Sequence, residues 1–271
     1  MKFIGVIPAR YASSRFPAKP LVDIGGKSMI QRVYEQAKKA ESLSRVVVAT
    51  DDERIFKHVE SFGGEVMMTS KNHESGTDRC AEVLQYANAE AVINDLDSNK
   101  NASSFAFKVK REKTTFDAVI NIQGDEPFIN PAQINQVAEI LRGGVFHIAT
   151  LAKRLDDSEL IHNPNVVKVV FSSEGRALYF SRSPIPFLRN VPQSEWHLSG
   201  AFFKHLGLYG YKSSALKNLA ELPQSGLEKW ESLEQLRWLE AGFTIGIGLT
   251  KLETIGIDTP EDLAKIKHLI I

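Results

Sequence analysis

Three cations follow the first apolar stretch of the chain. "KFIGVI" predicts a buried strand over residues 2–7, and "IPARYASSRFPAKPL" places Arg10, Arg15 and Lys19 after it with no acidic residue among them. A polyphosphate spreads its negative charge over several oxygens, for which arginine offers a bidentate fork and lysine a mobile point charge. Neither of the two common glycine-rich phosphate-binding patterns occurs here. The loop therefore predicts binding of a small ligand with phosphate groups.

A carboxylate follows another apolar strand. "DAVINI", residues 117–122, runs directly into "QGDEP", which contains Asp125. Ligands of an open α/β sheet gather beyond the carboxyl ends of its strands, so we expect Asp125 on the same edge as the cations. Carboxylate and phosphate oxygens together are the usual ligands of Mg²⁺, which is the predicted cofactor. Asp258 in "GIDTPEDL" is a second candidate ligand, although this string is also a good helix N-terminus and leaves both readings open.

The stretch "SGTDR", residues 75–79, allows two readings. Thr77 or Asp78 can cap the helix that follows, which would be a purely structural role. Alternatively, Ser75 and Gly76 approach a planar base through their backbone, and Arg79 points along the edge of that base.

Apolar runs of strand length alternate with amphipathic runs of helix length, which is typical of a mostly parallel sheet covered by helices on both faces. The expected strands of this part are 2–7, 45–50, 65–69 and 117–122, and the expected helices are 28–40, 52–63, 77–87 and 131–143. Strand-like runs with short links then predict a smaller β-rich lobe over about 150–212, inside a single domain of residues 1–271. Later expected elements are a helix over 227–242, a strand over 244–249 and a helix over 260–271.

Residues 88–113 contain four asparagines and many charges but no glycine or proline. Connections between a helix and a strand usually have about 2–6 residues. The stretch is therefore predicted to be a surface insertion, with a small hairpin at "FAFKVK".

Bulk composition narrows the class of ligand. The chain has 271 residues with 33 basic and 33 acidic side chains, and the net charge is zero. Nucleic-acid-binding proteins usually carry a basic excess, so no nucleic-acid partner is expected. The single cysteine, Cys80, excludes a disulfide within the chain and argues against a cysteine metal site. No apolar run reaches the roughly 20 residues that span a bilayer, and a signal peptide is not expected, so the predicted location is the cytoplasm, away from membranes.

Eight stretches in this order resemble a known family. They are "IPARYASSRFPAKPL", "HESGTDR", "NIQGDEPFI", "NPNVVKVV", "ALYFSRSPIPF", "HLGLYGY", "LEQLR" and "GIDTPEDL". Together they resemble the 3-deoxy-manno-octulosonate (Kdo) cytidylyltransferases, over nearly the whole chain apart from 88–113. The resemblance implies a Rossmann-like fold of the nucleotide-diphospho-sugar transferase type, a homodimer formed through the β-rich lobe, and a role in lipopolysaccharide biosynthesis. The implied reaction is CTP plus Kdo to CMP-Kdo plus pyrophosphate, with Mg²⁺.

The resemblance also implies roles for individual residues. The triphosphate would be bound by Arg10, Arg15 and Lys19, and the metal by Asp125 and Asp258. Cytidine would be surrounded by Pro8, Ala9, Ser75, Gly76 and Arg79, with Gln123 near the ribose or the sugar acid. The sugar acid would be bound by Arg182, His205, Tyr209, Glu234 and Gln235. Phe187 and Leu188 depart from the family pattern, in which a tryptophan and a polar residue are expected.

Some of these residues also have structural readings. His205 and Tyr209 lie in an apolar strand, where packing roles are common, and Glu234 with Arg237 has the spacing of a surface ion pair on a helix. Two other functions stay open. One is CTP-dependent activation of another acidic sugar, such as 8-amino-Kdo or a sialic acid, and the other is nucleotide binding without catalysis.

Overall fold

The computed structural model describes residues 1–12, 16–96 and 115–265, with the backbone alone over 90–96. The chain folds as two units. The first contains residues 1–135 and 254–271, and the second contains residues 136–253. The β-rich lobe expected over about 150–212 falls within the second unit, and its role in dimerisation stays a prediction.

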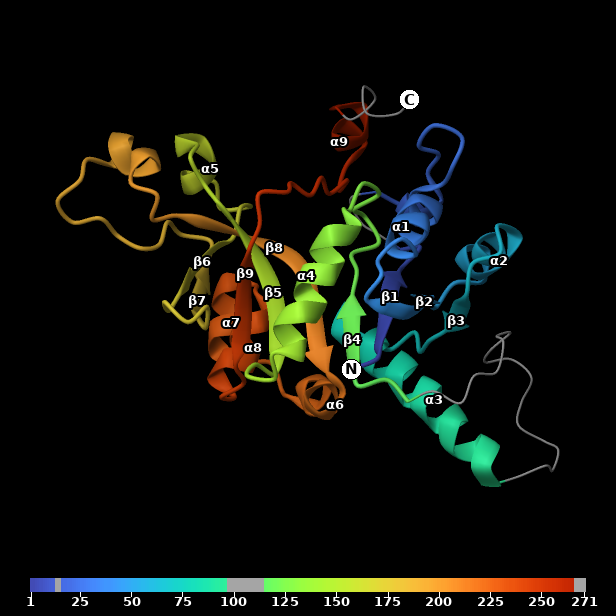
Figure 1. Ribbon diagram of the computed structural model, residues 1–271. Helices are drawn as coiled ribbons and strands as arrows, with labels where there is room; N and C mark the ends of the chain where they lie inside the picture. Colours follow the sequence, from blue (N-terminus) through green and yellow to red (C-terminus); the bar gives the residue numbers. More distant parts are fainter. Residues whose placement is uncertain (13–15, 97–114, 266–271) are drawn as a thin grey trace. The chain divides into compact units, whose positions relative to one another are not determined.

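The first unit contains four parallel strands in the order β3-β2-β1-β4 (Figure 1). They are β1 (Phe3–Ala9), β2 (Leu43–Thr50), β3 (Val66–Met68) and β4 (Ala118–Asn121). All residues of β1 except Pro8 are buried, and successive side chains of a strand point to opposite faces. Both faces of this sheet are therefore covered, as the continuous apolar runs predicted.

Helices pack against these strands because their apolar residues recur on one side. Among the helices of the first unit are α1 (Met29–Ala37), α2 (Glu53–Ser61) and α3 (Gly76–Leu96), and α4 (Pro131–Arg142) begins there. The side chain of Ser28 caps α1 by accepting a hydrogen bond from the N–H of Gln31, and Asp52 caps α2 in the same way. Such caps satisfy N–H groups that have no partner within the helix.

The end of the chain returns to the first unit. Ile257 has no exposed surface and packs in one apolar cluster with Ile24 and Met29. This cluster lies beside the short helix η1 (Lys19–Leu21), which precedes Ile24, and the last described helix is α9 (Pro260–Lys265). Apolar burial therefore brings the residues around 257 to the loop that follows β1. The rest of the helix expected over 260–271 lies outside the described residues.

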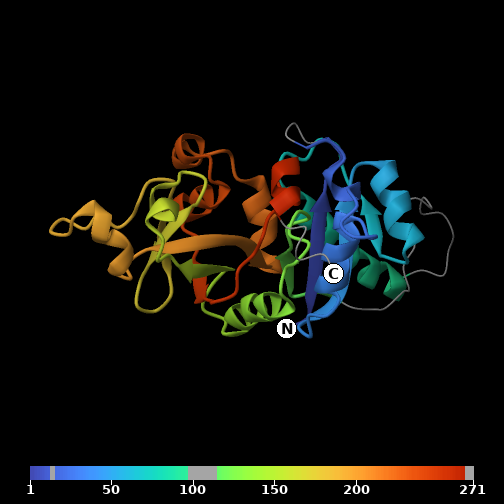
Figure 2. The ribbon, with the colours of Figure 1, turned by 90° about the horizontal axis from the view of Figure 1, so that it is seen from above.

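The second unit has a mixed sheet. Its strand β5 (Ile148–Arg154) pairs antiparallel with β8 (Phe203–Lys212) and parallel with β9 (Ile245–Leu249). A hairpin of β6 (Lys168–Phe171) and β7 (Ala177–Ser181) adjoins β8. Three helical segments here were not expected from the sequence: α5 (Ser158–His162), η2 (Gln193–Leu198) and α6 (Ser213–Glu221). Figure 2 shows the same strands from above.

The single helix expected over 227–242 is wrong, because the structure has two. Helix α7 (Gly226–Glu231) and helix α8 (Glu234–Glu240) are separated by Ser232, whose φ of 51° is left-handed. A left-handed residue stops a helix, and glycine usually marks such a position in a sequence. A serine gives no such signal.

The predicted insertion begins inside a helix. Helix α3 runs on to Leu96, nine residues beyond the predicted end at residue 87, because "NAEAVINDL" contains no glycine or proline to stop it. Asn88 bonds to both the N–H (2.8 Å) and the carbonyl (3.3 Å) of Phe116. The chain therefore leaves and re-enters the fold at neighbouring points, as expected of an insertion. The hairpin predicted at "FAFKVK" lies outside the described residues.

None of the described helices is both long enough and apolar enough to cross a membrane.

Candidate active site

An ammonium group bridges two carboxylates in the first unit. The Nζ of Lys19 lies 2.8 Å from Asp125 Oδ2 and 3.1 Å from Asp258 Oδ1. The side chain of Lys19 is 13% exposed, whereas those of Asp125 and Asp258 are 30% and 45% exposed. We call these residues the Lys19 trio. Residues predicted from three distant stretches of sequence thus meet at one point, where both carboxylates are partly exposed to solvent.

Main-chain contacts hold the trio together. Strand β4 ends at Asn121 beside Val6 of β1, so the loop that leaves β4 begins alongside the last residues of β1. The N–H of Ile257 donates to the carbonyl of Asp125 at 2.9 Å, which fixes Asp258 next to Asp125. Gly124 lies so close to β1 that a Cβ built on it would be 2.6 Å from the Pro8 carbonyl oxygen. Only glycine allows this approach.

The trio fits a magnesium ion. Among the described residues there is no group of three or more His, Cys, Asp or Glu side chains that could hold a metal. Two carboxylates suffice for Mg²⁺ when phosphate oxygens and water complete its six ligands. The position of the Lys19 ammonium between Asp125 and Asp258 shows that this place accepts a cation. The two carboxylates would therefore suit Mg²⁺ bound to phosphate oxygens, and the metal stays a prediction.

The other predicted residues of the loop after β1 lie at the strand end. Ala9 is buried, and Arg10 is exposed and donates from its guanidinium to the carbonyl of His73, in the loop before α3. Arg15 lies outside the described residues. The register pairs Ala9 with Thr50, so Arg10 and Asp51 directly follow neighbouring strand ends.

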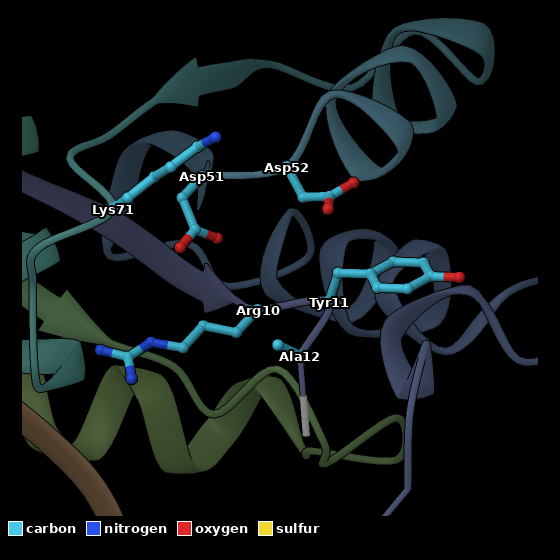
Figure 3. A pocket seen from close by; sticks show the side chains of 6 residues that line it. All are labelled: Arg10, Tyr11, Ala12, Asp51, Asp52 and Lys71. Atoms are coloured by element: carbon cyan, nitrogen blue, oxygen red, sulfur yellow. The ribbon is translucent and has the colours of Figure 1, made fainter. Parts of the chain in front are cut away.

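A pocket of about 360 Å³ opens beside these strand ends (Figure 3). The residues that line it are Arg10, Tyr11, Ala12, Asp51, Asp52 and Lys71. Arg54, which pairs with Asp52, lies over the ring of Tyr11 at 3.3 Å from its centroid and thereby holds the ring in place. The pocket thus offers cationic and anionic groups beside an aromatic ring.

In the structure, "SGTDR" caps helix α3, but the capping residue differs from the two that were expected. Ser75 Oγ accepts from the N–H of Asp78 at 3.1 Å, and Asp78 Oδ2 accepts from the N–H of Ser75 at 2.9 Å. This reciprocal pair is a capping box at the start of α3, with Ser75 as the cap, where the sequence pointed to Thr77 or Asp78. Gly76 packs against Pro8, because a Cβ on it would lie 3.3 Å from Pro8 Cγ. Ser75 and Gly76 are thereby brought to the end of β1, where the predicted contact with a base requires them.

Arg79 is fully buried, and its guanidinium is engaged. It donates to Thr69 Oγ1 at 2.6 Å and to Asp51 Oδ2 at 2.9 Å. Its contact with a base stays a prediction, because the structure gives its terminal nitrogens other partners. Asp51 was missed in the sequence analysis, although its place directly after β2, like that of Arg10 after β1, could have revealed it. Gln123 is half-buried in the loop before Asp125, and its role also stays a prediction.

The predicted sugar-acid residues belong to the second unit, where His205 and Tyr209 share one packed cluster. Their ring centroids lie 5.2 Å apart, and His205 Nε2 lies 3.0 Å from Thr150 Oγ1. Desolvation lowers the pKa of His205 to about 3. Burial also raises the pKa of Tyr209, whose buried hydroxyl has no hydrogen-bond partner among the described residues. A neutral imidazole and an unpaired phenol are groups that suit the hydroxyls of a sugar.

The low pKa of His205 predicts an acid-sensitive fold. Below pH 6.5 the unfolded chain takes up a proton at this histidine and the folded chain does not, so stability is lost as pH falls from about 6.5 towards 3. We expect this histidine alone to cost about 1–2 kcal/mol of the free energy of unfolding between pH 7.5 and pH 5. Urea unfolding of the wild type and of His205→Gln at both pH values measures the difference. Parallel losses in the two proteins would contradict this prediction.

Glu234 and Gln235 begin helix α8. Glu234 pairs with Arg237 at 2.9 Å, and Arg237 also lies 3.3 Å from Glu228, so the ion pair expected from the sequence is part of a group of three charges. Gln235 is buried. A pocket of about 380 Å³ lies at this place and is lined by Gln224, Glu228, Lys229, Ser232 and Glu234.

Arg182 lies at the end of β7 with its side chain fully engaged. Its Nε, Nη1 and Nη2 donate to the carbonyls of Glu231 (2.7 Å), Pro164 (2.9 Å) and Ser232 (3.3 Å). Each nitrogen of the guanidinium thus has a main-chain partner. A direct contact of Arg182 with a sugar carboxylate stays a prediction.

Comparison with known proteins identifies the family. A family model described as cytidylyltransferase matches residues 4–255. The 3-deoxy-manno-octulosonate cytidylyltransferase of Parabacteroides distasonis is 50% identical over 269 residues, which cover 98% of this chain and 96% of the relative. The protein of the same name from Thermodesulfovibrio yellowstonii is 48% identical over 263 residues, covering 97% and 96%. The chain belongs to the 3-deoxy-manno-octulosonate cytidylyltransferase family.

Solved structures agree with this membership. The structure of a CMP:2-keto-3-deoxy-manno-octonic acid synthetase complexed with CTP is 40% identical, has a TM-score of 0.83, and matches 100% of this chain and 98% of that one. A cytidylyltransferase from Leptospira borgpetersenii is 16% identical with a TM-score of 0.56, covering 98% and 85%, and shows the common fold alone. The family and the mixed, mostly parallel fold that the sequence motifs implied are confirmed.

Proposed function

We propose that this cytidylyltransferase transfers CMP from CTP to Kdo and releases pyrophosphate. The Lys19 trio carries the proposal, since it places a cation and two carboxylates where the triphosphate-binding loop and the metal-binding loop were each expected. The family, whose members of known structure include one complexed with CTP, supports the choice of nucleotide. Transfer to a sugar acid agrees with the names of the relatives.

The residues of the first unit would serve the nucleotide. Asp125 and Asp258 would hold Mg²⁺, which supplies charge neutralisation for the phosphates and a lower pKa for a hydroxyl bound to it. Lys19 and Arg10 would bind phosphate oxygens, and the same role is proposed for Arg15. A phosphoryl-type transfer needs little covalent chemistry from the protein, so positioning and charge are the main tasks of these side chains.

The residues of the second unit would serve the sugar acid. Tyr209 has a buried hydroxyl that can donate to a sugar oxygen, and its raised pKa keeps the proton on it at neutral pH. His205 is neutral there and therefore binds hydroxyls by hydrogen bonds, without adding positive charge. Glu234 and Gln235 would accept from further hydroxyls.

Pyrophosphate release tests the proposed function. We expect release that needs CTP, Kdo and Mg²⁺ together and that stops when EDTA is added. Replacing Kdo by 8-amino-Kdo or a sialic acid, and CTP by the three other nucleotides, tests the specificity. Faster release with another sugar would move the assignment to that sugar, and CTP binding without any release would support the non-catalytic alternative.

The proposal extends to the setting of the reaction. CMP-Kdo would feed lipopolysaccharide biosynthesis in the cytoplasm, and the active form would be a homodimer. Apolar side chains exposed on the second unit, among them Phe187 and Leu198 at 70% each, support an interface there. Light scattering at several protein concentrations measures the oligomeric state.

A further inference from the structure

Lys168 is a lysine of β6 with no exposed surface. Its Nζ donates to the main-chain carbonyls of Asn163 (3.0 Å), Val166 (2.6 Å) and Arg182 (2.5 Å). Three carbonyl acceptors call for the three N–H bonds of the ammonium form, because a neutral amine has two. Burial lowers the pKa of Lys168, and the negative charge of Glu231 opposes this shift. The buried ammonium group of Lys168 therefore bonds to main-chain carbonyls of the fold.

Glu231 joins the end of α7 to the end of β7. Its Oε1 accepts from Ser181 Oγ at 2.6 Å, and its Oε2 accepts from the N–H of Arg182 at 2.9 Å. Glu231 is the last residue of α7, and Ser181 is the last residue of β7. Both oxygens of the carboxylate are therefore occupied by neutral donors from one strand end.

The side chain of Arg182 also joins the end of β7 to the end of α7, this time through main-chain carbonyls. Its guanidinium donates to the carbonyls of Pro164, Glu231 and Ser232, as described above. Three segments therefore meet in one network: the turn of residues 163–166, the end of β7, and the junction between α7 and α8. We call Lys168, Arg182 and Glu231 the junction network.

The junction itself is in a strained conformation. Ser232 has a φ of 51°, and the following Leu233 caps α8 without a side-chain hydrogen bond. A left-handed residue other than glycine costs on the order of 1–3 kcal/mol and persists only where its surroundings fix it. The bond from Arg182 to the Ser232 carbonyl supplies this restraint, and Glu234 follows two residues later.

We propose that Lys168 and Glu231 are positioning residues that act through Arg182 to fix the junction before α8, and thereby the place of Glu234 in the sugar-acid site. This inference rests on the proposed function, in which Glu234 binds the sugar acid. In this inference the guanidinium of Arg182 holds the main chain of the junction through its bonds to the carbonyls of Glu231 and Ser232. Ser232 and Glu234 both line the pocket of about 380 Å³, so a shift of the junction changes the shape of that pocket.

Stability alone does not call for such a network. Buried charged groups are often replaced by well-packed apolar residues without loss of stability, because removing charges from water is costly. What directional hydrogen bonds add is a defined backbone geometry. The network should therefore affect the binding of Kdo and leave that of CTP almost unchanged. A purely structural role would not produce this difference.

The test compares Glu231→Ala and Glu231→Gln with Glu240→Ala, a matched control on an exposed glutamate at the end of α8. Steady-state pyrophosphate release gives kcat and separate KM values for Kdo and CTP, and thermal unfolding gives Tm. We expect Glu231→Ala to raise the KM for Kdo by about tenfold or more and to leave the KM for CTP within about twofold. Glu231→Gln keeps one acceptor oxygen and should fall between Glu231→Ala and the wild type. Glu240→Ala should match the wild type.

The outcomes separate the two proposals. Wild-type protein that does not use Kdo overturns the proposed function, and this inference falls with it. Active wild type with a lower Tm but an unchanged KM for Kdo in Glu231→Ala overturns the inference alone, as does an equal rise of both KM values. Lys168→Met removes one donor from each of three main-chain carbonyls, of which that of Asn163 keeps the N–H of Val166, and the variant can fail to fold. If Glu231→Ala also fails to fold, Glu231→Gln, which keeps size and an acceptor, decides, and an unchanged KM for Kdo in this variant overturns the inference.

Discussion

Asp125→Asn is expected to lower the rate of CTP-dependent pyrophosphate release by about 10³-fold or more while the fold is kept. The substitution retains the size of the side chain and one acceptor oxygen but removes the charge that a magnesium–phosphate site requires. Lys19 keeps Asp258 as its partner at 3.1 Å, and Asp125 is 30% exposed, so no buried charge is left unpaired. The free energy of unfolding should therefore change by less than about 1 kcal/mol.

The control for this variant lies at the other end of the same strand. Asp117 precedes β4, is 55% exposed and bonds to the N–H of Lys2. Asp117→Asn removes the same charge far along the strand from the Lys19 trio and should leave the rate within about twofold of the wild type. Rates measured over a range of magnesium concentrations complete the comparison. Asp125→Asn that keeps the wild-type rate and magnesium dependence would rule out the metal-binding role.

Gly124→Ala is expected to reduce both turnover and stability. The added methyl carbon would lie 2.6 Å from the Pro8 carbonyl oxygen, and this main-chain atom cannot turn aside as a flexible side chain could. The loop that carries Asp125 must then move away from β1, and a shift of about 1 Å in a catalytic group can cost about 10²-fold in rate. Crowding of this kind costs about 1–3 kcal/mol of stability. Urea unfolding and pyrophosphate release measure the two effects.

Gly256→Ala is the matched control for Gly124→Ala. Gly256 lies in the same unit, two residues before Asp258, and a Cβ on it would have no neighbour within 4 Å. We expect its stability to stay within about 0.5 kcal/mol of the wild type. If both alanine variants lose activity equally, the close approach of Gly124 to β1 is not what places Asp125.

The parts of the site that follow strand ends could be predicted from the sequence. Lys19 and Asp125 come after the apolar runs of β1 and β4, and the carboxyl ends of parallel strands lie on one edge of a sheet. That rule predicts one edge for both residues, and the structure brings them into contact at 2.8 Å. Asp258 was left open because its stretch is also a good helix N-terminus. Burial of Ile257 brings it to the same place.

Other contacts depend on pairs of residues that a single sequence does not connect. The sequence analysis predicted that Arg79 faces a base, and it did not show that Arg79 is buried and bonded to Asp51, 28 residues earlier in the chain. The resemblance implied that Arg182 binds the sugar acid, and the sequence did not show that its donors reach carbonyls up to 50 residues away. The break before α8 was missed because Ser232 adopts a conformation that tertiary contacts impose and that its own side chain does not favour.

The wide separation of the Lys19 trio along the chain affects how a ribosome makes this enzyme. Lys19 is separated from Asp125 by 106 positions and from Asp258 by 239. Synthesis proceeds from the N-terminus at about 5–20 residues per second, so early strands can pair while the last aspartate is still being translated. The Lys19 trio is therefore complete only near the end of translation. A transcript cut short before codon 258 yields a product that lacks Asp258.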